Sequence, residues 1–356
     1  MDYTSNYENA LELLMELISV PSVSRDEELA ADLVLHHLIN HGYMAQRIGN
    51  NVICRSHHWD DSRRTLLLNS HIDTVKPVGG WTRHPYSPVI EDGRLYGLGS
   101  NDDGAGLVSL LQTFFLLDAA GQSYNILFVA SCEEEVSGEG GMKKILDVLP
   151  SIDVALIGEP TGMQPAVAER GLMVLDMEVH GLAGHAARNE GINSIIRAIR
   201  IISLVNEFCD DLQDSDILGS VKMTPTIINA GTQHNVIPDV CTLTFDVRSN
   251  DMYTNRELFD ALQAKMPEWC HMKARSFCLN SSSIATDHPL IRRAVGMGLV
   301  PFGSPTLSDQ SLLSCPSFKM GPGDSARSHT ADEYIRLEEL SAAIPQYYTL
   351  LNGATL

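Results

Sequence analysis

The sequence is short of positive charge and of long apolar runs. Its 25 lysines and arginines stand against 45 aspartates and glutamates, which gives a formal net charge of −20. Such a charge repels the phosphates of nucleic acids and the headgroups of anionic lipids. No apolar run approaches the roughly 20 residues that a membrane-spanning helix needs. We therefore expect neither nucleic acid nor a membrane as a partner.

Cysteines are few as well. There are seven, an odd number, and no two of them form a Cys-x-x-Cys pair. Reduced thiols in a cytosol are the simplest account, because the disulfide frameworks of secreted proteins use paired cysteines. Residues 1–8 contain neither the basic nor the apolar segment of a secretory signal. We therefore expect a cytoplasmic protein.

The length indicates two domains. A chain of 356 residues with 44% hydrophobic side chains can bury more than one core of typical size. In its middle part, strand and helix patterns follow the order βαββαβ, which is typical of a ferredoxin-like sandwich. We predict an inserted domain at residues 172–279 within a discontinuous domain of residues 1–171 and 280–356. The expected strands of the insertion are 174–179, 226–229, 242–247 and 273–277, and its expected helices are 193–205 and 256–265.

The most informative stretch begins with an apolar run at residues 65–69 and ends in His71-Ile72-Asp73. A buried strand here delivers a histidine and a carboxylate to its C-terminal end, the edge at which open α/β sheets bind ligands. A metal-binding imidazole needs an acceptor for its second ring N–H, and a carboxylate two residues away can supply it. His71-x-Asp73 alone is equally compatible with an ordinary strand end, so other segments have to decide.

Two further apolar strands end in acids. Residues 125–130 run into Glu133-Glu134-Glu135, and residues 154–157 run into Gly158-Glu159. An acidic run is usually a solvated face. Carboxylates that gather at one edge of a sheet, however, repel one another unless a cation binds them. Three strands in succession that end in potential ligands therefore favour a metal site.

Two loops add candidates to this edge. Asp102 ends the loop Gly97-Leu98-Gly99-Ser100-Asn101-Asp102, which is not a dinucleotide-binding Gly-x-Gly-x-x-Gly motif because its sixth residue is an acid. His329 lies in a glycine-rich segment after a short strand. The resulting set contains two imidazoles and three carboxylates and no thiolate. Its members are His71, Asp102, Glu135, Glu159 and His329.

A nitrogen and oxygen donor set of this kind suits zinc, cobalt or manganese. It holds one carboxylate more than a single site needs, which indicates two ions that share one ligand and lower the pKa of a shared water. Glu134 lies next to a ligand but outside the set, so we predict that it is the general base. The reaction predicted from these residues is the hydrolysis of an amide.

The chain resembles the family of co-catalytic zinc deacylases and exopeptidases, which includes acetylornithine deacetylase, succinyl-diaminopimelate desuccinylase, aminoacylase and glutamate-releasing carboxypeptidases. The resemblance covers essentially the whole chain, and its motifs are specific only in combination. They are Ser70-His71-Ile72-Asp73-Thr74-Val75, Tyr96-Gly97-Leu98-Gly99-Ser100-Asn101-Asp102, Glu133-Glu134-Glu135, Gly158-Glu159-Pro160-Thr161, Gly184-His185, Asn235-Val236-Ile237-Pro238, Asp246-Val247-Arg248 and Gly321-Pro322-Gly323 followed by His329.

The resemblance implies roles for these residues. His71 and Glu159 would complete one zinc site and Glu135 and His329 the other, with Asp102 as the bridging ligand and a cis peptide bond after it. Asp73 would orient the His71 ring and Glu134 would carry the proton. His185 would stabilise the oxyanion, Arg248 would bind the substrate carboxylate, and Asn235 would help to position it.

The resemblance also implies the architecture. We expect an α/β fold of the zinc-peptidase type, with helices on both sides of a mixed sheet, and an inserted ferredoxin-like α+β domain that serves as lid and dimerisation domain. In the homodimer, His185 of one chain would reach the metals of the other.

Near the N-terminus, Ser24-x-x-Glu27 has the spacing of a capping box and predicts the start of a helix that ends near Gly42.

The expected function is the deacylation of an N-acyl amino acid, with N-acetyl- or N-succinyl-ornithine or -citrulline in arginine biosynthesis as the first choice. Succinyl-diaminopimelate desuccinylase and then a dipeptidase or carboxypeptidase are the alternatives among enzymes. A metal-dependent peptide-binding scaffold is the alternative without catalysis. The family usually has Arg at the position of Leu98 and a Lys-Gly step where this chain has Asp103-Gly104, so the motifs do not identify one member.

Overall fold

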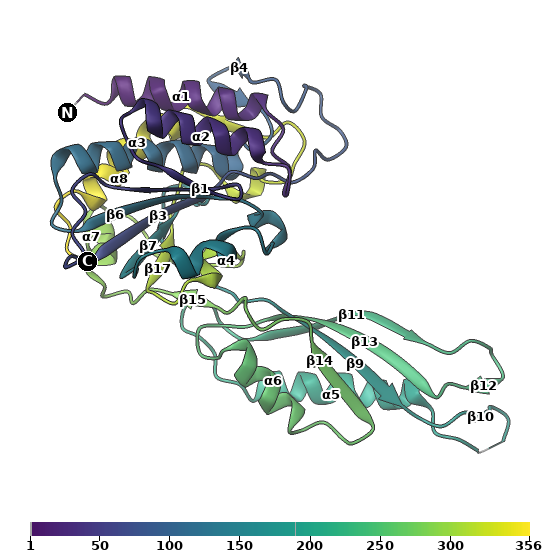
Figure 1. Ribbon diagram of the computed structural model, residues 1–356. Coiled ribbons are helices and arrows are strands. Elements are labelled where there is room, and N and C mark those ends of the chain that lie inside the picture. The colour runs from purple at the N-terminus through teal and green to yellow at the C-terminus, as the bar shows by residue number, and fades with distance from the viewer. Residues whose placement is uncertain (1, 189) are drawn as a thin grey trace. The chain divides into compact units, whose positions relative to one another are not determined.

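The computed structural model describes residues 2–188 and 190–356 (Figure 1). The chain divides into two compact units. Unit 1 comprises Met1–Val167, Ile284–Phe302 and Ser308–Leu356, and unit 2 comprises Ala168–Ser283 and Gly303–Leu307. The main segment of unit 2 thus begins four residues before the predicted insertion and ends four residues after it. Gly303–Leu307, predicted to lie in the discontinuous domain, also belongs to unit 2. None of the helices in the described part of the chain has the length and hydrophobicity needed to cross a bilayer.

A mixed sheet forms the centre of unit 1, which contains its strands β1, β2, β3, β6, β7 and β17 and the start of β8. Its strand order is β1-β2-β6-β3-β7-β17-β8-β15, with β16 also paired to β8. Strands β3, β6, β7 and β17 run parallel, whereas β2 and β8 pair antiparallel to their neighbours in this group. The strands are β1 (Gln46–Ile48), β2 (Asn51–Arg55), β3 (Thr65–His71), β6 (Asn125–Ser131), β7 (Val154–Ile157), β8 (Ala166–Glu169), β15 (Ser282–Ser283), β16 (Phe302–Ser304) and β17 (Ser317–Lys319).

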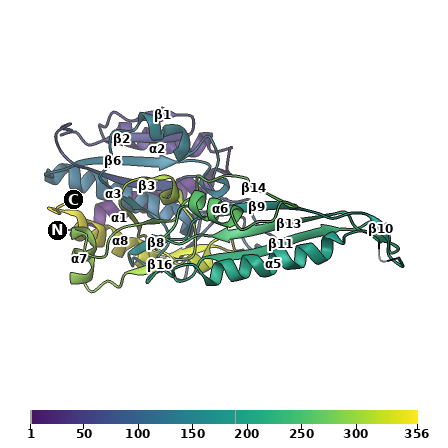
Figure 2. The same cartoon turned by 90° about the horizontal axis from the view of Figure 1, so that it is seen from below.

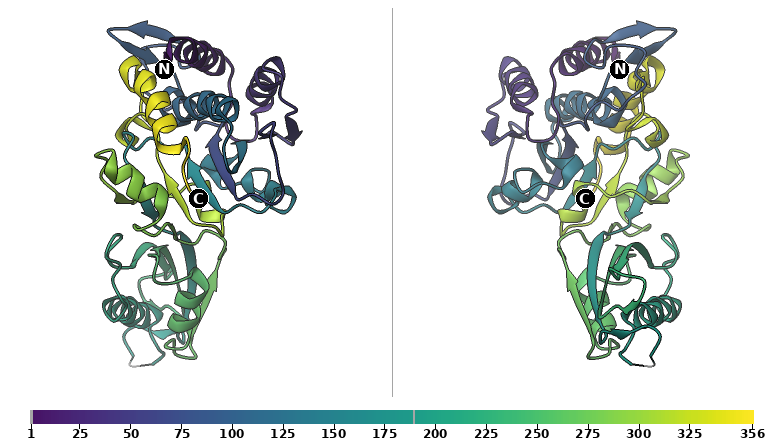
Figure 3. Two further views of the ribbon diagram at one scale, coloured as in Figure 1. Left: turned by 90° about the vertical axis from the view of Figure 1, so that its left-hand side faces the viewer. Right: turned by 90° about the vertical axis from the view of Figure 1, so that its right-hand side faces the viewer.

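Alternate side chains of the parallel strands enter two separate cores, because successive residues of a strand point to opposite faces. Leu66 and Leu68 pack beneath the long helices, and Leu67 packs on the other face with Met142 of α4. Helix α3 is buried along most of its length, which agrees with apolar residues all around it. It lies beside α1 and α8, as both views of Figure 3 show. The helices are α1 (Thr4–Ser19), α2 (Glu28–Asn40), α3 (Ala105–Ala120), α4 (Met142–Ile145), α7 (Pro289–Gly296) and α8 (Leu337–Leu351).

Short elements connect this framework to the ligand loops. A three-stranded sheet of order β18-β5-β4 brings the segment after His329 next to the segment before Asp102. Its strands are β4 (Val89–Glu91), β5 (Arg94–Tyr96) and β18 (Tyr334–Arg336). The single helical turns are η1 (Ser100–Gly104), η2 (Glu134–Val136), η3 (Leu146–Val148), η4 (Asp309–Leu312) and η5 (Ser325–Arg327).

Unit 2 is a four-stranded antiparallel sheet of order β11-β13-β9-β14 with two helices packed on one face. Figure 2 shows α5 running along this sheet. The elements follow one another as β9, α5, β11, β13, α6 and β14, which is the predicted βαββαβ order. They are β9 (Met173–His180), α5 (Ser194–Asp210), β11 (Lys222–Ala230), β13 (Val240–Arg248), α6 (Asn255–Gln263) and β14 (Cys270–Ala274), and a small ribbon pairs β10 (Gly184–His185) with β12 (Val236–Ile237).

The predicted capping box at Ser24 and Glu27 is wrong. Helix α2 begins at Glu28, and its N-cap residue Glu27 makes no side-chain cap hydrogen bond. The Ser24 hydroxyl instead donates to the Asp73 carboxylate at 2.7 Å. The buried Glu27 carboxylate accepts hydrogen bonds from Asn50 Nδ2 (2.8 Å) and from the Glu133 amide (3.3 Å). The Glu27 carboxylate also accepts a hydrogen bond from the Arg25 amide. One different local bond and partners from other loops therefore stand in place of the cap hydrogen bonds that the spacing predicted.

Candidate metal centre

His71 is the last residue of β3, a strand buried at every position. It is placed there because β3 lies between β6 and β7 and ends at the edge where the ligand loops meet. Its ring Nδ1 lies 2.9 Å from the backbone oxygen of Asp73 and 3.6 Å from the Asp73 carboxylate. When Nδ1 carries the proton and donates it, the lone pair of Nε2 is free, which is the arrangement that a metal-binding imidazole needs. The acceptor at hydrogen-bond distance is thus the carbonyl of Asp73.

The Asp73 carboxylate has a different set of partners. It accepts hydrogen bonds from the amides of Glu134 (3.0 Å) and Glu135 (3.2 Å), in addition to that of the Ser24 hydroxyl. Burial acts to raise the pKa of Asp73, but the contacts with His71, Ser24 and the Glu134 amide hold this pKa below its usual value. Asp73 therefore ties the turn that carries the two glutamates to the end of the histidine strand.

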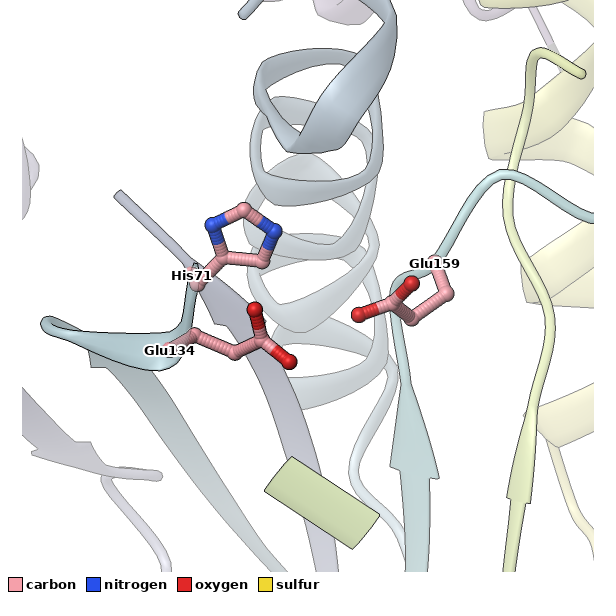
Figure 4. Close-up of side chains that lie close together, drawn as sticks. All are labelled: His71, Glu134 and Glu159. Atoms are coloured by element: carbon pink, nitrogen blue, oxygen red, sulfur yellow. The ribbon is translucent and has the colours of Figure 1, made fainter. Parts of the chain in front are cut away.

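The predicted ligands of unit 1 come together. Ligand atoms of His71, Glu134 and Glu159 lie within 4.8 Å of one another, and so do those of His71, Asp102 and Glu135. In Figure 4 the carboxylates of Glu134 and Glu159 point toward each other beside the His71 ring.

Asp102 and His329 complete the arrangement. The distance from His71 Nε2 to Asp102 Oδ1 is 3.2 Å, and His329 Nε2 lies 3.0 Å from Glu135 Oε1 and 3.7 Å from Asp102 Oδ2. The Asp102 carboxylate is therefore within reach of both imidazoles. This is the position that a bridging ligand requires.

Burial and neighbouring charges shift the pKa values of the carboxylates in this cluster. Burial raises the pKa of Glu134 well above its usual value, and the neighbouring Glu159 and Glu135 carboxylates raise it further, while His71 opposes them. For Asp102 the burial effect is outweighed by the hydrogen bond and charge of His71, so its pKa is lowered. Oxygen and imidazole donors with excess negative charge match divalent ions such as zinc, cobalt and manganese. The residues present thus fit a two-metal site.

The remaining predicted residues lie in unit 2. His185 is exposed on β10, and the ribbon to β12 sets it near Asn235, whose carbonyl accepts a hydrogen bond from the Ala186 amide at 3.0 Å. The Arg248 guanidinium binds Asp246 through two hydrogen bonds, of 2.8 and 3.2 Å. The planar fork that suits a substrate carboxylate is therefore engaged with a carboxylate of its own strand.

Glu333 also contributes to this region, although no pattern in the sequence predicted it. Its buried carboxylate accepts hydrogen bonds from the amides of Gly99 (3.2 Å), Asn101 (2.9 Å) and Asp102 (3.0 Å). Burial raises the pKa of Glu333 to about 7. Gly99 has φ of +76°, and a Cβ there would come within 2.7 Å of the Thr74 side chain, so this loop requires glycine. The Asp102-Asp103 peptide bond is cis, as the resemblance implied.

The chain is similar to known proteins in sequence and in fold. The model of peptidase family M20/M25/M40 matches residues 67–353. The chain is 28% identical over 360 residues to a succinyl-diaminopimelate desuccinylase of Corynebacterium glutamicum, covering 94% of this chain and 95% of the relative. It is 27% identical over 287 residues to an acetylornithine deacetylase of Proteus mirabilis, covering 76% and 74%. The fold matches a Bacillus subtilis protein described as a dinuclear metal-binding peptidase, with a TM-score of 0.71, 17% identity and 98% of both chains covered.

Divalent cations should stabilise unit 1, because they relieve the repulsion among its partly buried carboxylates. With free zinc about 1,000-fold above its Kd, we expect the free energy of unfolding to rise by about 4 kcal/mol. Differential scanning calorimetry of the metal-free protein, with and without zinc or cobalt, measures this. Asp102→Asn should reduce the shift. An unchanged unfolding midpoint with both ions would contradict the metal site.

Proposed function

The chain belongs to peptidase family M20/M25/M40, and on this basis we propose that it cleaves the amide of an N-acyl amino acid. As preferred substrates we propose N-acetyl- or N-succinyl-ornithine or -citrulline, which would place the enzyme in arginine biosynthesis. One observation supports the proposal most strongly. Ligand atoms of His71, Asp102 and Glu135 lie close together, and so do those of His71, Glu134 and Glu159. Relatives named for deacetylation and desuccinylation support the class of substrate.

We assign two zinc ions to the site, with cobalt or manganese as substitutes. His71 and Glu159 would hold one ion, Glu135 and His329 the other, and Asp102 both. When bound, such a pair lowers the pKa of a shared water and polarises the substrate carbonyl. The donor set supports this assignment, since it combines imidazole nitrogen with carboxylate oxygen and uses no thiolate.

The residues of this chain supply the proton chemistry. Glu134 accepts a proton from the attacking water and donates it to the amine nitrogen as the amide C–N bond breaks. Its position supports this role, because its amide is fixed by Asp73 while its carboxylate lies in the group formed with His71 and Glu159. Through these amide hydrogen bonds, Asp73 holds the turn that carries Glu134 in a fixed position relative to the end of the strand that carries His71 while the proton is transferred.

Residues of unit 2 would bind the rest of the substrate. His185 would donate a hydrogen bond to the oxyanion of the tetrahedral intermediate. Its Nδ1 accepts a hydrogen bond from the Ala187 amide at 3.1 Å, which leaves the Nε2–H of this exposed ring as the donor. Arg248, helped by Asn235, would hold the substrate carboxylate. To do this, the guanidinium has to exchange or share its partner Asp246.

Succinyl-diaminopimelate desuccinylase is the second candidate. The relative that is 28% identical and almost fully covered bears this name, and this observation favours it. A dipeptidase or carboxypeptidase is the third, and all three would use the same catalytic groups. We place the enzyme in the cytoplasm, where its seven thiols would stay reduced. A scaffold that binds metal and peptide without catalysis is disfavoured by Glu134, which such a protein does not need.

A substrate panel tests the proposal. It comprises N-acetyl and N-succinyl derivatives of ornithine, citrulline, lysine and diaminopimelate, together with dipeptides, each assayed with zinc or cobalt. We expect the highest kcat/KM on an acyl-ornithine or acyl-citrulline. Preference for succinyl-diaminopimelate or for dipeptides would select the second or third candidate. Turnover that survives complete chelation would overturn the mechanism itself.

Glu134→Gln should separate catalysis from metal binding. The amide cannot accept the proton, so we expect kcat to fall about 10²–10⁴-fold while both ions remain bound. Metal content is measured by elemental analysis of the dialysed protein. Glu139→Gln is the matched control, because Glu139 has an exposed side chain and pairs only with Lys143 in the described structure. Near-normal kcat with full occupancy would assign the base to another residue.

We further propose a homodimer formed through unit 2. Ile195, Ile196 and Ile199 of α5 are 37–53% exposed, and Ile227 and Ile228 of β11 are 51% and 52% exposed. Strand β11 is an edge of the four-stranded sheet, so part of its backbone is available for pairing. Helix α5 packs on the same strand. An edge strand beside an exposed apolar helix face suits a second copy of this chain.

The dimer and the role of His185 are tested together by mixing two inactive proteins. His185→Ala retains Glu134, and Glu134→Gln retains His185, so a heterodimer regains one complete site if the histidine acts on the partner chain. Under conditions that exchange subunits, activity should return to about a quarter of the wild-type value for random mixing of a two-fold dimer. Native mass spectrometry confirms the exchange. Heterodimers without activity would show that His185 does not act across the interface.

A further inference from the structure

Glu333 lies between the His329 loop and strand β18, and its side chain is buried. A buried carboxylate needs hydrogen-bond donors, since desolvation without them is costly. Glu333 has three, and all are backbone amides of one loop. Its Oε1 accepts from Asn101 and Asp102, and its Oε2 accepts from Gly99. Both oxygens are therefore directed at the segment that presents Asp102.

A second set of contacts joins the same two segments. Asn101 Nδ2 donates to the Asp324 carbonyl (3.1 Å) and to Ser328 Oγ (3.2 Å), and its Oδ1 accepts from the Asp324 amide (3.0 Å). Gly323 has φ of +95°, and a Cβ there would lie 2.4 Å from Asn101 Oδ1. Close approach of the two loops thus depends on glycine at this position. The loop that precedes His329 and the loop that ends in Asp102 consequently form one hydrogen-bonded body.

We infer that Glu333 is a positioning residue that fixes the orientation of the bridging carboxylate Asp102 relative to His329. The inference rests on the proposed two-metal function. Asp102 is the one ligand assigned to both ions, so a disturbance of its backbone reaches both sites. Asp73 differs in this respect. Its carboxylate accepts hydrogen bonds from the amides of Glu134 and Glu135, whereas Glu333 accepts those of the Asp102 loop.

Glu333→Gln tests the inference. Glutamine keeps the size of the side chain but replaces one accepting oxygen with an NH2 group, which cannot accept an amide N–H. We expect the Kd values of both zinc ions to rise together, by about 10–100-fold. They are measured on the folded protein by competition with a chromophoric chelator, an assay that needs no substrate. With zinc at saturation, kcat should fall and KM should change less than kcat.

The matched control is Glu338→Gln, which removes an exposed carboxylate a few residues further along, where it pairs with Arg336. It should leave both zinc affinities unchanged. A residue that only stabilises the fold would lower the unfolding temperature without altering zinc affinity. Zinc affinities of folded Glu333→Gln within twofold of wild type would therefore overturn the inference.

Glu333→Asp is the second variant, for use if Glu333→Gln does not fold. It retains both accepting oxygens but shortens the side chain by one methylene, so we expect a rise of about 10-fold in both Kd values. Unchanged affinities in this variant would equally contradict the inference. Failure of the proposed function has a different signature, because wild-type protein would then bind fewer than two zinc ions in the same assay.

Discussion

Repulsion among carboxylates is the constraint on which the active region of unit 1 depends. Glu134, Glu135, Glu159 and Asp102 all approach His71 at one edge of the sheet. In a partly buried region the interaction between like charges is several times stronger than in water. Burial accordingly raises the pKa of Glu134 when protein groups alone surround it. Divalent cations bound to these carboxylates would make the arrangement favourable, so the proposed ions would be part of the structure of the site.

The fold opposes this repulsion by fixing the backbone of the strands and loops that carry the ligands. The parallel strands provide rigid starting points, and two buried carboxylates, Asp73 and Glu333, hold the loops that follow. Each accepts main-chain amides of a ligand segment: Asp73 those of Glu134 and Glu135, and Glu333 that of Asp102. Negative side chains thus support the loops that carry other negative side chains. The backbone amides reduce the desolvation cost of the buried Asp73 and Glu333 carboxylates, because they donate hydrogen bonds and do not titrate.

Much of this was predictable from the sequence, because the ligands follow strands. An apolar run that stops at a histidine or an acid identifies both the strand and its C-terminal edge, and β7 has the predicted bounds Val154–Ile157. Asp73 was predicted as the partner of His71, but the residues that hold Asp73 and the Asp102 loop were not predictable. Ser24 has the spacing of a helix cap, yet it binds Asp73, 49 positions further along the chain. Glu333 contacts the amide of Asp102, 231 positions away, and no local pattern encodes such a contact.

Two metal ions are expected in the group of ligands around Asp102. Anomalous diffraction from crystals grown with zinc, recorded above and below the zinc edge, would locate them. Two peaks should lie roughly 3.5–4 Å apart, with the Asp102 carboxylate between them, His71 and Glu159 beside one, and Glu135 and His329 beside the other. A single peak, or two peaks that do not share Asp102, would show that the proposed two-ion site is wrong.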